Sequence, residues 1–152
     1  MIGLFLAIFF FNAIAFLTNT RLTKNEILHL WTFTIAFQSL VDLLLNHKYQ
    51  GYWYFTEDVD IIALPALTVL VPPVNMMFVN WYPFNRRFLI QSIYIIVWSV
   101  SLILYELVTL LPEPWGYFHY GWWKIYYSLL ENPVLLVILV SYYRWVKKIA
   151  KE

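Results

Sequence analysis

Five stretches of mostly apolar residues, separated by short polar connections, dominate the pattern of the chain. A helix that crosses the hydrocarbon core of a bilayer needs roughly 20 consecutive, mainly apolar residues. The five stretches reach or approach that length, so we expect each to be a transmembrane helix. They cover residues 2–17, 27–46, 61–80, 88–111 and 122–145. Residues 13–15 (Ala-Ile-Ala) resemble a signal-peptidase site, but no basic segment precedes them, and we expect a retained helix.

The polar connections agree with this division of the chain. Thr23 and Glu26 stand three residues apart before the second stretch, which is the pattern of a capping box at a helix start. Pro112 and Gly116 mark the last long connection, whose other residues are largely aromatic, as expected at a membrane interface. There is no internal repeat. We therefore predict one all-α domain over residues 1–152, an integral membrane bundle of five transmembrane helices.

Composition supports a membrane class and excludes several functions. Hydrophobic residues make up 62% of the chain and charged residues 12%, where about a half and a quarter are usual in soluble domains. The net charge of +1 argues against nucleic acid as a partner, because phosphate binding needs a basic stripe. The chain contains no cysteine, no phosphate-binding glycine loop and no nucleophile elbow. We expect no enzymatic activity and no cofactor.

The distribution of lysine and arginine predicts the orientation in the membrane. Basic residues are enriched in cytoplasmic connections. Eight of them follow the first, third and fifth stretches, whereas Lys48 and Lys124 fall on the other side. The eight are Arg21, Lys24, Arg86, Arg87, Arg144, Lys147, Lys148 and Lys151. This split predicts a multi-pass protein of the cell membrane with its N-terminus outside and its C-terminus in the cytoplasm.

Three carboxylates lie within the predicted membrane helices. Ionisable groups in a bilayer are costly, and each is a candidate functional residue. Asp42 and Glu106 stand four and five residues from the outer ends of their helices, roughly 6 to 8 Å deep at the helical rise. Glu131 falls at a comparable depth. We expect the three to converge on one outward-facing pocket for a ligand or ion.

Helical spacing adds two polar residues to this candidate pocket. Gln38 precedes Asp42 by four residues, and Ser99 precedes Glu106 by seven, so each pair shares a helix face. The alternative is that these groups only hydrogen-bond between helices and hold the bundle together. The spacing leaves both interpretations open.

The third stretch contains Pro72-Pro73 near its middle, followed by Asn75. Two adjacent prolines remove two backbone donors and free the carbonyls one turn earlier. In many transporters a helix broken in this way exposes its backbone to a substrate or ion. A packing kink is the alternative, because proline is frequent in membrane helices.

The three histidines do not form a recognisable metal site. In the predicted topology His29 lies near the inner face, whereas His47 and His119 lie near the outer one. The last two, with Asp42 or Glu106, have the ligand types of a zinc site. No paired ligand spacing accompanies them. We expect no bound metal.

The last third of the chain carries a distinctive pattern. A glutamate near the outer end of a helix is followed by an aromatic loop with glycine and tryptophan, and then by a helix that opens on an aromatic-serine stretch. The residues are Leu104-Tyr105-Glu106-Leu107, Gly116-Tyr117, Tyr120-Gly121-Trp122-Trp123 and Tyr126-Tyr127-Ser128. In this pattern the chain resembles a family of small multi-spanning membrane proteins from Bacillota, many from spore formers. The resemblance implies a bacterial plasma membrane, no established activity, and a last helix that starts near Trp122.

Two functions fit these expectations. The first is a non-enzymatic membrane protein whose outer pocket senses a small ligand or contacts another membrane subunit. The alternative is a proton- or cation-coupled transporter or channel component that uses Asp42 and Glu106. Five helices are few for a complete transporter, so the alternative requires a homo-oligomer.

Overall fold

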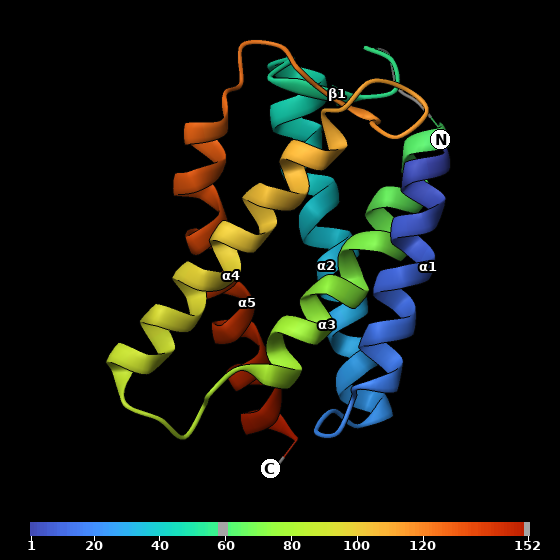
Figure 1. Ribbon diagram of the computed structural model, residues 1–152. Helices are drawn as coiled ribbons and strands as arrows, with labels where there is room; N and C mark the ends of the chain where they lie inside the picture. Colours follow the sequence, from blue (N-terminus) through green and yellow to red (C-terminus); the bar gives the residue numbers. More distant parts are fainter. Residues whose placement is uncertain (58–60, 151–152) are drawn as a thin grey trace.

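The computed structural model describes residues 1–57 and 61–150. This part of the chain folds into a bundle of helices with a small two-stranded sheet at one end (Figure 1). The α-helices are α1 (Ile2–Leu17), α2 (Lys24–Asp42), α3 (Val71–Trp81), α4 (Phe88–Thr109) and α5 (Ile125–Ile149). The strands are β1 (Tyr52–Tyr54) and β2 (Phe118–Tyr120), which pair antiparallel. The predicted all-α bundle is confirmed, and the short sheet was not predicted.

Four helical segments of the described chain are long and apolar enough to cross a membrane. They are Lys24–Lys48, Ile61–Trp81, Phe88–Thr109 and Ile125–Ile149. The remaining predicted span, α1, is apolar but has only 16 residues. The structure thus supports a membrane-embedded bundle with four helices of full spanning length and one shorter apolar helix, rather than five equal spans.

The predicted capping box opens α2. The Thr23 side chain accepts a hydrogen bond from the Glu26 backbone N–H, and the Glu26 carboxylate accepts one from the Thr23 N–H at 2.8 Å. At its other end α2 continues into a π-helical segment, η1 (Leu43–Lys48). At the far end of the chain α5 begins at Ile125, three residues after the predicted start, and runs on through Pro133.

Pro72 and Pro73 do not interrupt their helix. The helical span runs from Ile61 to Trp81, and the two prolines occupy the first turn of α3. Their effect appears directly before them, where the segment η3 (Ala66–Leu70) is π-helical. A ring without an N–H is tolerated at a helical first turn, and the wider π-helical turn adjoins it.

The carbonyls that the prolines free are bound by other helices. In an α-helix the missing N–H groups would bond to the carbonyls of Thr68 and Val69. Instead the Trp31 indole N–H of α2 donates to the Thr68 carbonyl at 2.9 Å. The Asn12 amide of α1 donates to the Val69 carbonyl at 2.9 Å. The proline pair therefore joins α1, α2 and α3, and its freed backbone is not left open to a ligand.

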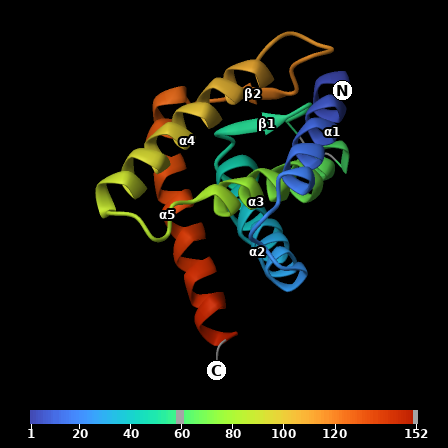
Figure 2. The ribbon, with the colours of Figure 1, turned by 60° about the horizontal axis from the view of Figure 1, so that its bottom comes forward.

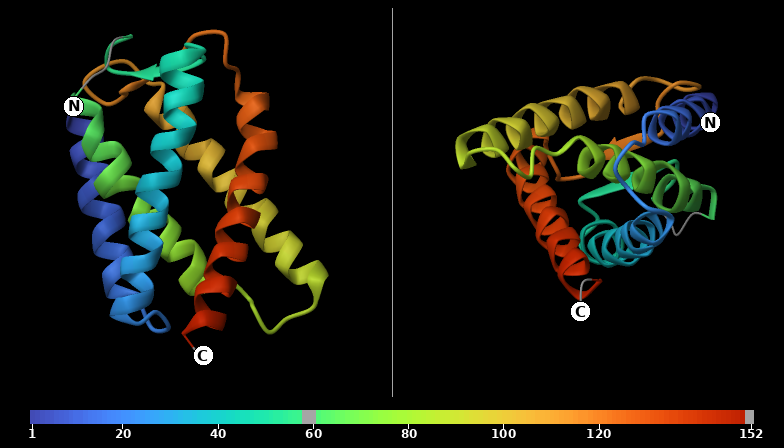
Figure 3. Two further views of the ribbon diagram at one scale, coloured as in Figure 1. Left: turned by 180° about the vertical axis from the view of Figure 1, so that it is seen from behind. Right: turned by 90° about the horizontal axis from the view of Figure 1, so that it is seen from below.

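The two ends of the bundle differ in charge. The sheet and the N-terminus lie at one end, and the C-terminus lies at the other with the α1–α2 and α3–α4 connections (Figures 1 and 3). Hereafter these are the sheet end and the C-terminal end. The basic residues predicted for the cytoplasmic side belong to the C-terminal end, except Lys151, which lies outside the described residues.

The core sits between α2, α3 and α5, around Met76, Phe78, Leu136 and Leu139. The helix α4 crosses the others obliquely (Figure 2). It is the least buried of the spanning helices, with mainly Ile, Val and Leu side chains on its outer face. This oblique crossing leaves space between α4 and the rest of the bundle, and the cavities described below lie there.

Candidate functional site

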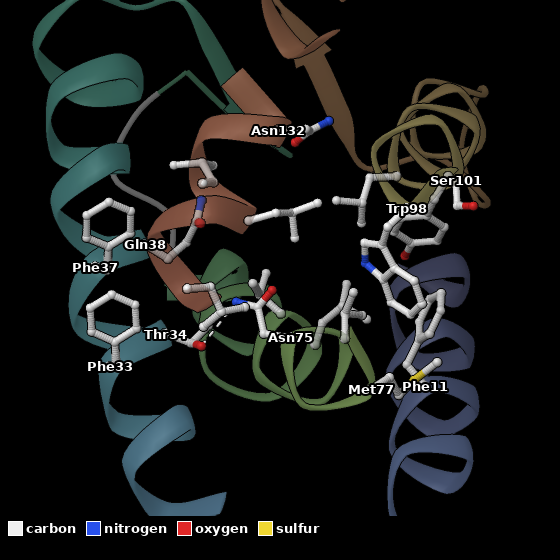
Figure 4. A pocket seen from close by; sticks show the side chains of 18 residues that line it. Phe11, Phe33, Thr34, Phe37, Gln38, Asn75, Met77, Trp98, Ser101 and Asn132 are labelled. Atoms are coloured by element: carbon white, nitrogen blue, oxygen red, sulfur yellow. Dashed lines mark hydrogen bonds between the residues drawn. The ribbon is translucent and has the colours of Figure 1, made fainter. Parts of the chain in front are cut away.

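Two adjoining cavities lie inside the bundle. The first, the acid-lined cavity, has a volume of about 200 Å³ and lies under the sheet between α2, α4 and α5. The second, the apolar cavity, has a volume of about 360 Å³ and receives side chains from all five helices (Figure 4). The residues that line both are Gln38, Leu70, Val71, Tyr105, Asn132 and Leu135. These shared walls make the two cavities neighbours along the bundle.

Asp42 stands behind the wall of the acid-lined cavity. Its Oδ1 atom accepts a hydrogen bond from the Tyr52 hydroxyl at 2.5 Å and one from the Gln38 amide at 3.4 Å. Tyr52 and Gln38 both line the cavity. Asp42 is only 3% exposed, and its Oδ2 atom is buried without a hydrogen-bond partner among the described residues. The carboxylate is thus held by neutral donors on one oxygen only.

Glu106 lines the same cavity from α4. Its Oε1 atom accepts hydrogen bonds from the Tyr120 hydroxyl at 2.5 Å and the Ser128 hydroxyl at 2.7 Å. The Trp123 indole N–H in turn donates to Ser128 at 2.9 Å. A directed chain of hydrogen bonds therefore runs from Trp123 through Ser128 to the carboxylate.

Glu131 lines the cavity from α5 and makes no hydrogen bond to any described residue. Glu106 lines the same cavity, and Asp42 stands behind its wall. No lysine, arginine or histidine stands among the described residues that line this cavity. Two acidic side chains thus line one cavity, a third stands behind its wall, and the described lining holds no opposite charge.

The sheet forms the roof of this cavity. Tyr52 of β1 is directly opposite Tyr120 of β2, and Trp53 is opposite His119. Because side chains alternate along a strand, the first pair faces the helices and the second faces away. Tyr52 reaches Asp42 on α2 and Tyr120 reaches Glu106 on α4. The roof is therefore tied to two helices through two carboxylates.

The roof tyrosines remain protonated donors. Burial raises the pKa of Tyr52, Tyr54 and Tyr120 above the ordinary value for a phenol, and the carboxylates below add to the effect. A neutral phenol satisfies an oxygen atom, but it does not cancel a carboxylate charge. The roof therefore adds no charge that offsets the carboxylates.

The structure brings together most of the residues singled out in the sequence. Gln38, Asp42, Glu106 and Glu131 meet at the acid-lined cavity, although their binding role stays a prediction. Ser99 is the exception. It lines neither cavity, and its hydroxyl donates to the Ile95 carbonyl one turn back on α4 at 2.8 Å. The Ser99 hydroxyl is therefore hydrogen-bonded within its own helix.

Asn75 lies in the apolar cavity, where its amide donates to the Thr34 hydroxyl at 3.1 Å (Figure 4). Because side chains bind the carbonyls before Pro72 and Pro73, the two prolines contribute to packing between helices. In the described part of the chain, no three His, Asp or Glu side chains are arranged to hold a metal ion.

Sequence reasoning missed the roof tyrosines. Their signal is short: three consecutive aromatic residues after Gly51, and Phe118, His119 and Tyr120 before Gly121. A Cβ atom on Gly121 would collide with the Gln50 carbonyl and press on the Trp53 ring, so this position requires glycine. Without the pairing of the two strands, the aromatic residues resemble ordinary interfacial side chains.

Comparisons with known proteins add no relative. No protein-family model matches the chain, and neither does any curated protein or solved structure that was searched. A function therefore has to rest on the geometry of the two cavities.

Proposed function

We propose that the protein is a non-enzymatic binding protein of a bacterial cell membrane that takes a small cationic ligand into the acid-lined cavity from the outer side. One observation carries the proposal: Glu106 and Glu131 line one cavity, Asp42 stands behind its wall, and the described lining holds no basic side chain. Buried carboxylates without an opposite charge are costly. A cation in the cavity removes that cost.

The hydrogen-bonding pattern favours an ammonium group. Asp42 Oδ2 and the Glu131 carboxylate lack hydrogen-bond donors among the described residues. An ammonium group supplies both charge and several N–H donors, and such charge-assisted bonds are stronger than neutral ones. The arrangement thus fits a protonated amine better than a neutral ligand.

The proposed orientation places the sheet end outside. The basic residues of the described chain concentrate at the C-terminal end, and the positive-inside rule then puts that end in the cytoplasm. In this proposal α1 acts as the fifth span in spite of its length. The resemblance of the last third of the chain to Bacillota membrane proteins supports a plasma membrane location.

The roof supplies a route from ligand to signal. A ligand ammonium competes with Tyr52 and Tyr120 for the carboxylates that tie the sheet to α2 and α4. Ligand binding therefore loosens the roof from the helices. A partner membrane subunit that contacts the sheet end would respond to this change. We therefore propose a role in sensing rather than in catalysis.

Binding of tritiated ethylammonium to the purified protein in lipid nanodiscs tests the proposal. We expect saturable binding that Glu131→Gln weakens by about tenfold, the loss of one hydrogen bond between charged groups. Glu131→Gln is the sharpest variant because it breaks no hydrogen bond to a described residue. The matched control is Glu113→Gln, an exposed acid at the same end of the molecule. Absent binding, or equal binding in all three proteins, contradicts the proposal.

A cation-coupled transporter or channel component is the second candidate. It is favoured by the shared walls of the two cavities, which extend the acidic space toward the middle of the bundle. It predicts pH-dependent cation flux in proteoliposomes, lost in Asp42→Asn and Glu106→Gln. Flux that is absent, or unchanged in these variants, eliminates it.

A further inference from the structure

We infer that the ligand is an amphiphilic amine, with its ammonium group among the carboxylates of the acid-lined cavity and its hydrocarbon chain in the apolar cavity. This inference rests on the proposed function and names its ligand class. The two cavities adjoin, and six side chains line both. A ligand that fills the first cavity therefore meets the second along the axis of the bundle.

Polarity changes in one direction between the cavities. Thr34 and Asn75 bind each other in the apolar cavity, and Ser101 donates to the Val97 carbonyl of its own helix. The two side-chain amides Gln38 and Asn132 belong to the shared wall, where Gln38 donates to Asp42. Figure 4 shows Asn132 at one end of the cavity and the Thr34–Asn75 pair toward the other.

The remaining lining of the apolar cavity is hydrocarbon and aromatic, with Phe11, Phe33 and Phe37 among its walls. Ordered water needs two to four polar partners, and this surface offers few of them. A hydrocarbon chain gains free energy in the same space by leaving water. One donor stays free, because the buried Trp98 indole N–H has no partner among the described residues. A single acceptor atom in the chain of the ligand would satisfy it.

Charge decides between an amine and a membrane phospholipid as the occupant. A phospholipid whose acyl chain entered the apolar cavity would carry its phosphate toward Glu106 and Glu131. Phosphate and carboxylate repel each other, and the described lining holds no cation to separate them. An ammonium group at the same place is attracted by every charged residue of the cavity.

A series of n-alkylammonium ions from ethyl to hexyl tests the inference in nanodiscs, with affinities referred to the free aqueous concentration. Each methylene that enters an apolar site strengthens binding by about fourfold. We expect that increase in the wild type. In Val74→Phe, where the larger ring occupies the apolar cavity, ethylammonium should bind as before, whereas the gain with chain length should disappear.

Val137→Phe is the matched control, because Val137 is 49% exposed on the outer face of α5. It adds the same bulk toward lipid and should keep the wild-type increase. Equal increases in all three proteins, or none in the wild type, overturn the inference while ethylammonium binding still supports the proposed function. If no amine binds saturably, the proposed function itself fails.

A second measurement locates the chain if Val74→Phe does not fold. The probe is 6-bromohexylammonium, whose bromine quenches tryptophan fluorescence on contact. Trp98 lines the apolar cavity and not the acid-lined one. We expect saturable quenching in the wild type that Trp98→Phe largely removes. Quenching of equal amplitude in both proteins places the chain elsewhere and overturns the inference.

Discussion

Acidic side chains lie within the bundle at both ends, and their surroundings differ. At the C-terminal end Glu26 is 5% exposed and pairs with the Lys147 ammonium at 2.8 Å. It also accepts hydrogen bonds from the Tyr143 hydroxyl at 3.0 Å and the Thr23 N–H at 2.8 Å. At the sheet end Glu131 has neither an ion pair nor a hydrogen bond among the described residues.

The difference separates a carboxylate that stabilises the fold, Glu26, from one that makes no stabilising contact among the described residues, Glu131. Glu26 caps the first turn of α2, and its partners on α5 join the two helices. Its charge is cancelled where it stands. Glu131 makes no such contact among the described residues, and the fold places it near two other carboxyl groups. Like charges in a shared space oppose folding, and the cation binding proposed above would relieve that cost.

We expect the largest effect at the C-terminal end, where the Glu26 carboxylate is paired and hydrogen-bonded. Glu26→Ala removes the capping box and leaves Tyr143 and the Lys147 ammonium without their partner. We expect a loss of about 3 kcal/mol in the free energy of unfolding, from one helix cap and one hydrogen bond to a charged group. Denaturation in mixed micelles measures it. Lys147→Ala should cost less, because the Lys147 side chain is 49% exposed, and an equal loss would contradict this account.

At the sheet end, substitution of the acid should change the free energy of unfolding in the opposite direction. Glu131→Leu replaces an unpaired acid by an apolar side chain of similar size. We expect the protein to become more stable by about 1 kcal/mol while ethylammonium binding is lost. If the variant is destabilised as strongly as Glu26→Ala, Glu131 has a structural role, and the contrast between the two ends disappears.

The roof bonds should have intermediate effects. Tyr52→Phe leaves Asp42 Oδ1 with only the long Gln38 contact, and Tyr120→Phe leaves Glu106 with Ser128 alone. We expect each to lower the free energy of unfolding by about 1.5 kcal/mol. Each should also strengthen ethylammonium binding, because the phenol no longer competes for the carboxylate. Weaker binding in both variants would mean that the phenols contact the ligand instead.

The smallest effect should fall on Ser99. Ser99→Ala removes only a hydrogen bond to the Ile95 carbonyl within α4, and we expect a change of less than about 0.5 kcal/mol. Ser128→Ala is the matched comparison, since Ser128 links Trp123 to Glu106. It should cost about 1 kcal/mol or more. Equal values would show that the chain of hydrogen bonds adds no stability.

The sequence predicts the parts of this site that depend on one helix at a time. Hydrophobic length places the helices, and the distance of Asp42 and Glu106 from their helix ends places both at one depth. The roof depends on strands far apart in the chain, and no local pattern reports that pairing. The prediction for Ser99 rested on the helix face that it shares with Glu106. A shared face shows where a side chain points, but not which group its hydroxyl binds. Likewise, Pro72 and Pro73 reveal freed carbonyls but not the side chains that bind them.

The bonds from Asn12 and Trp31 to the backbone before Pro72 also bear on the order of assembly. Ribosomal synthesis delivers α1 and α2 to the membrane before α3. The donors that α3 needs are therefore already in the bilayer when its two uncovered carbonyls arrive. Neither α4 nor α5 has to be made first. The first three helices can thus pack together during translation. The two later helices, α4 and α5, then complete the cavities by packing against α1, α2 and α3.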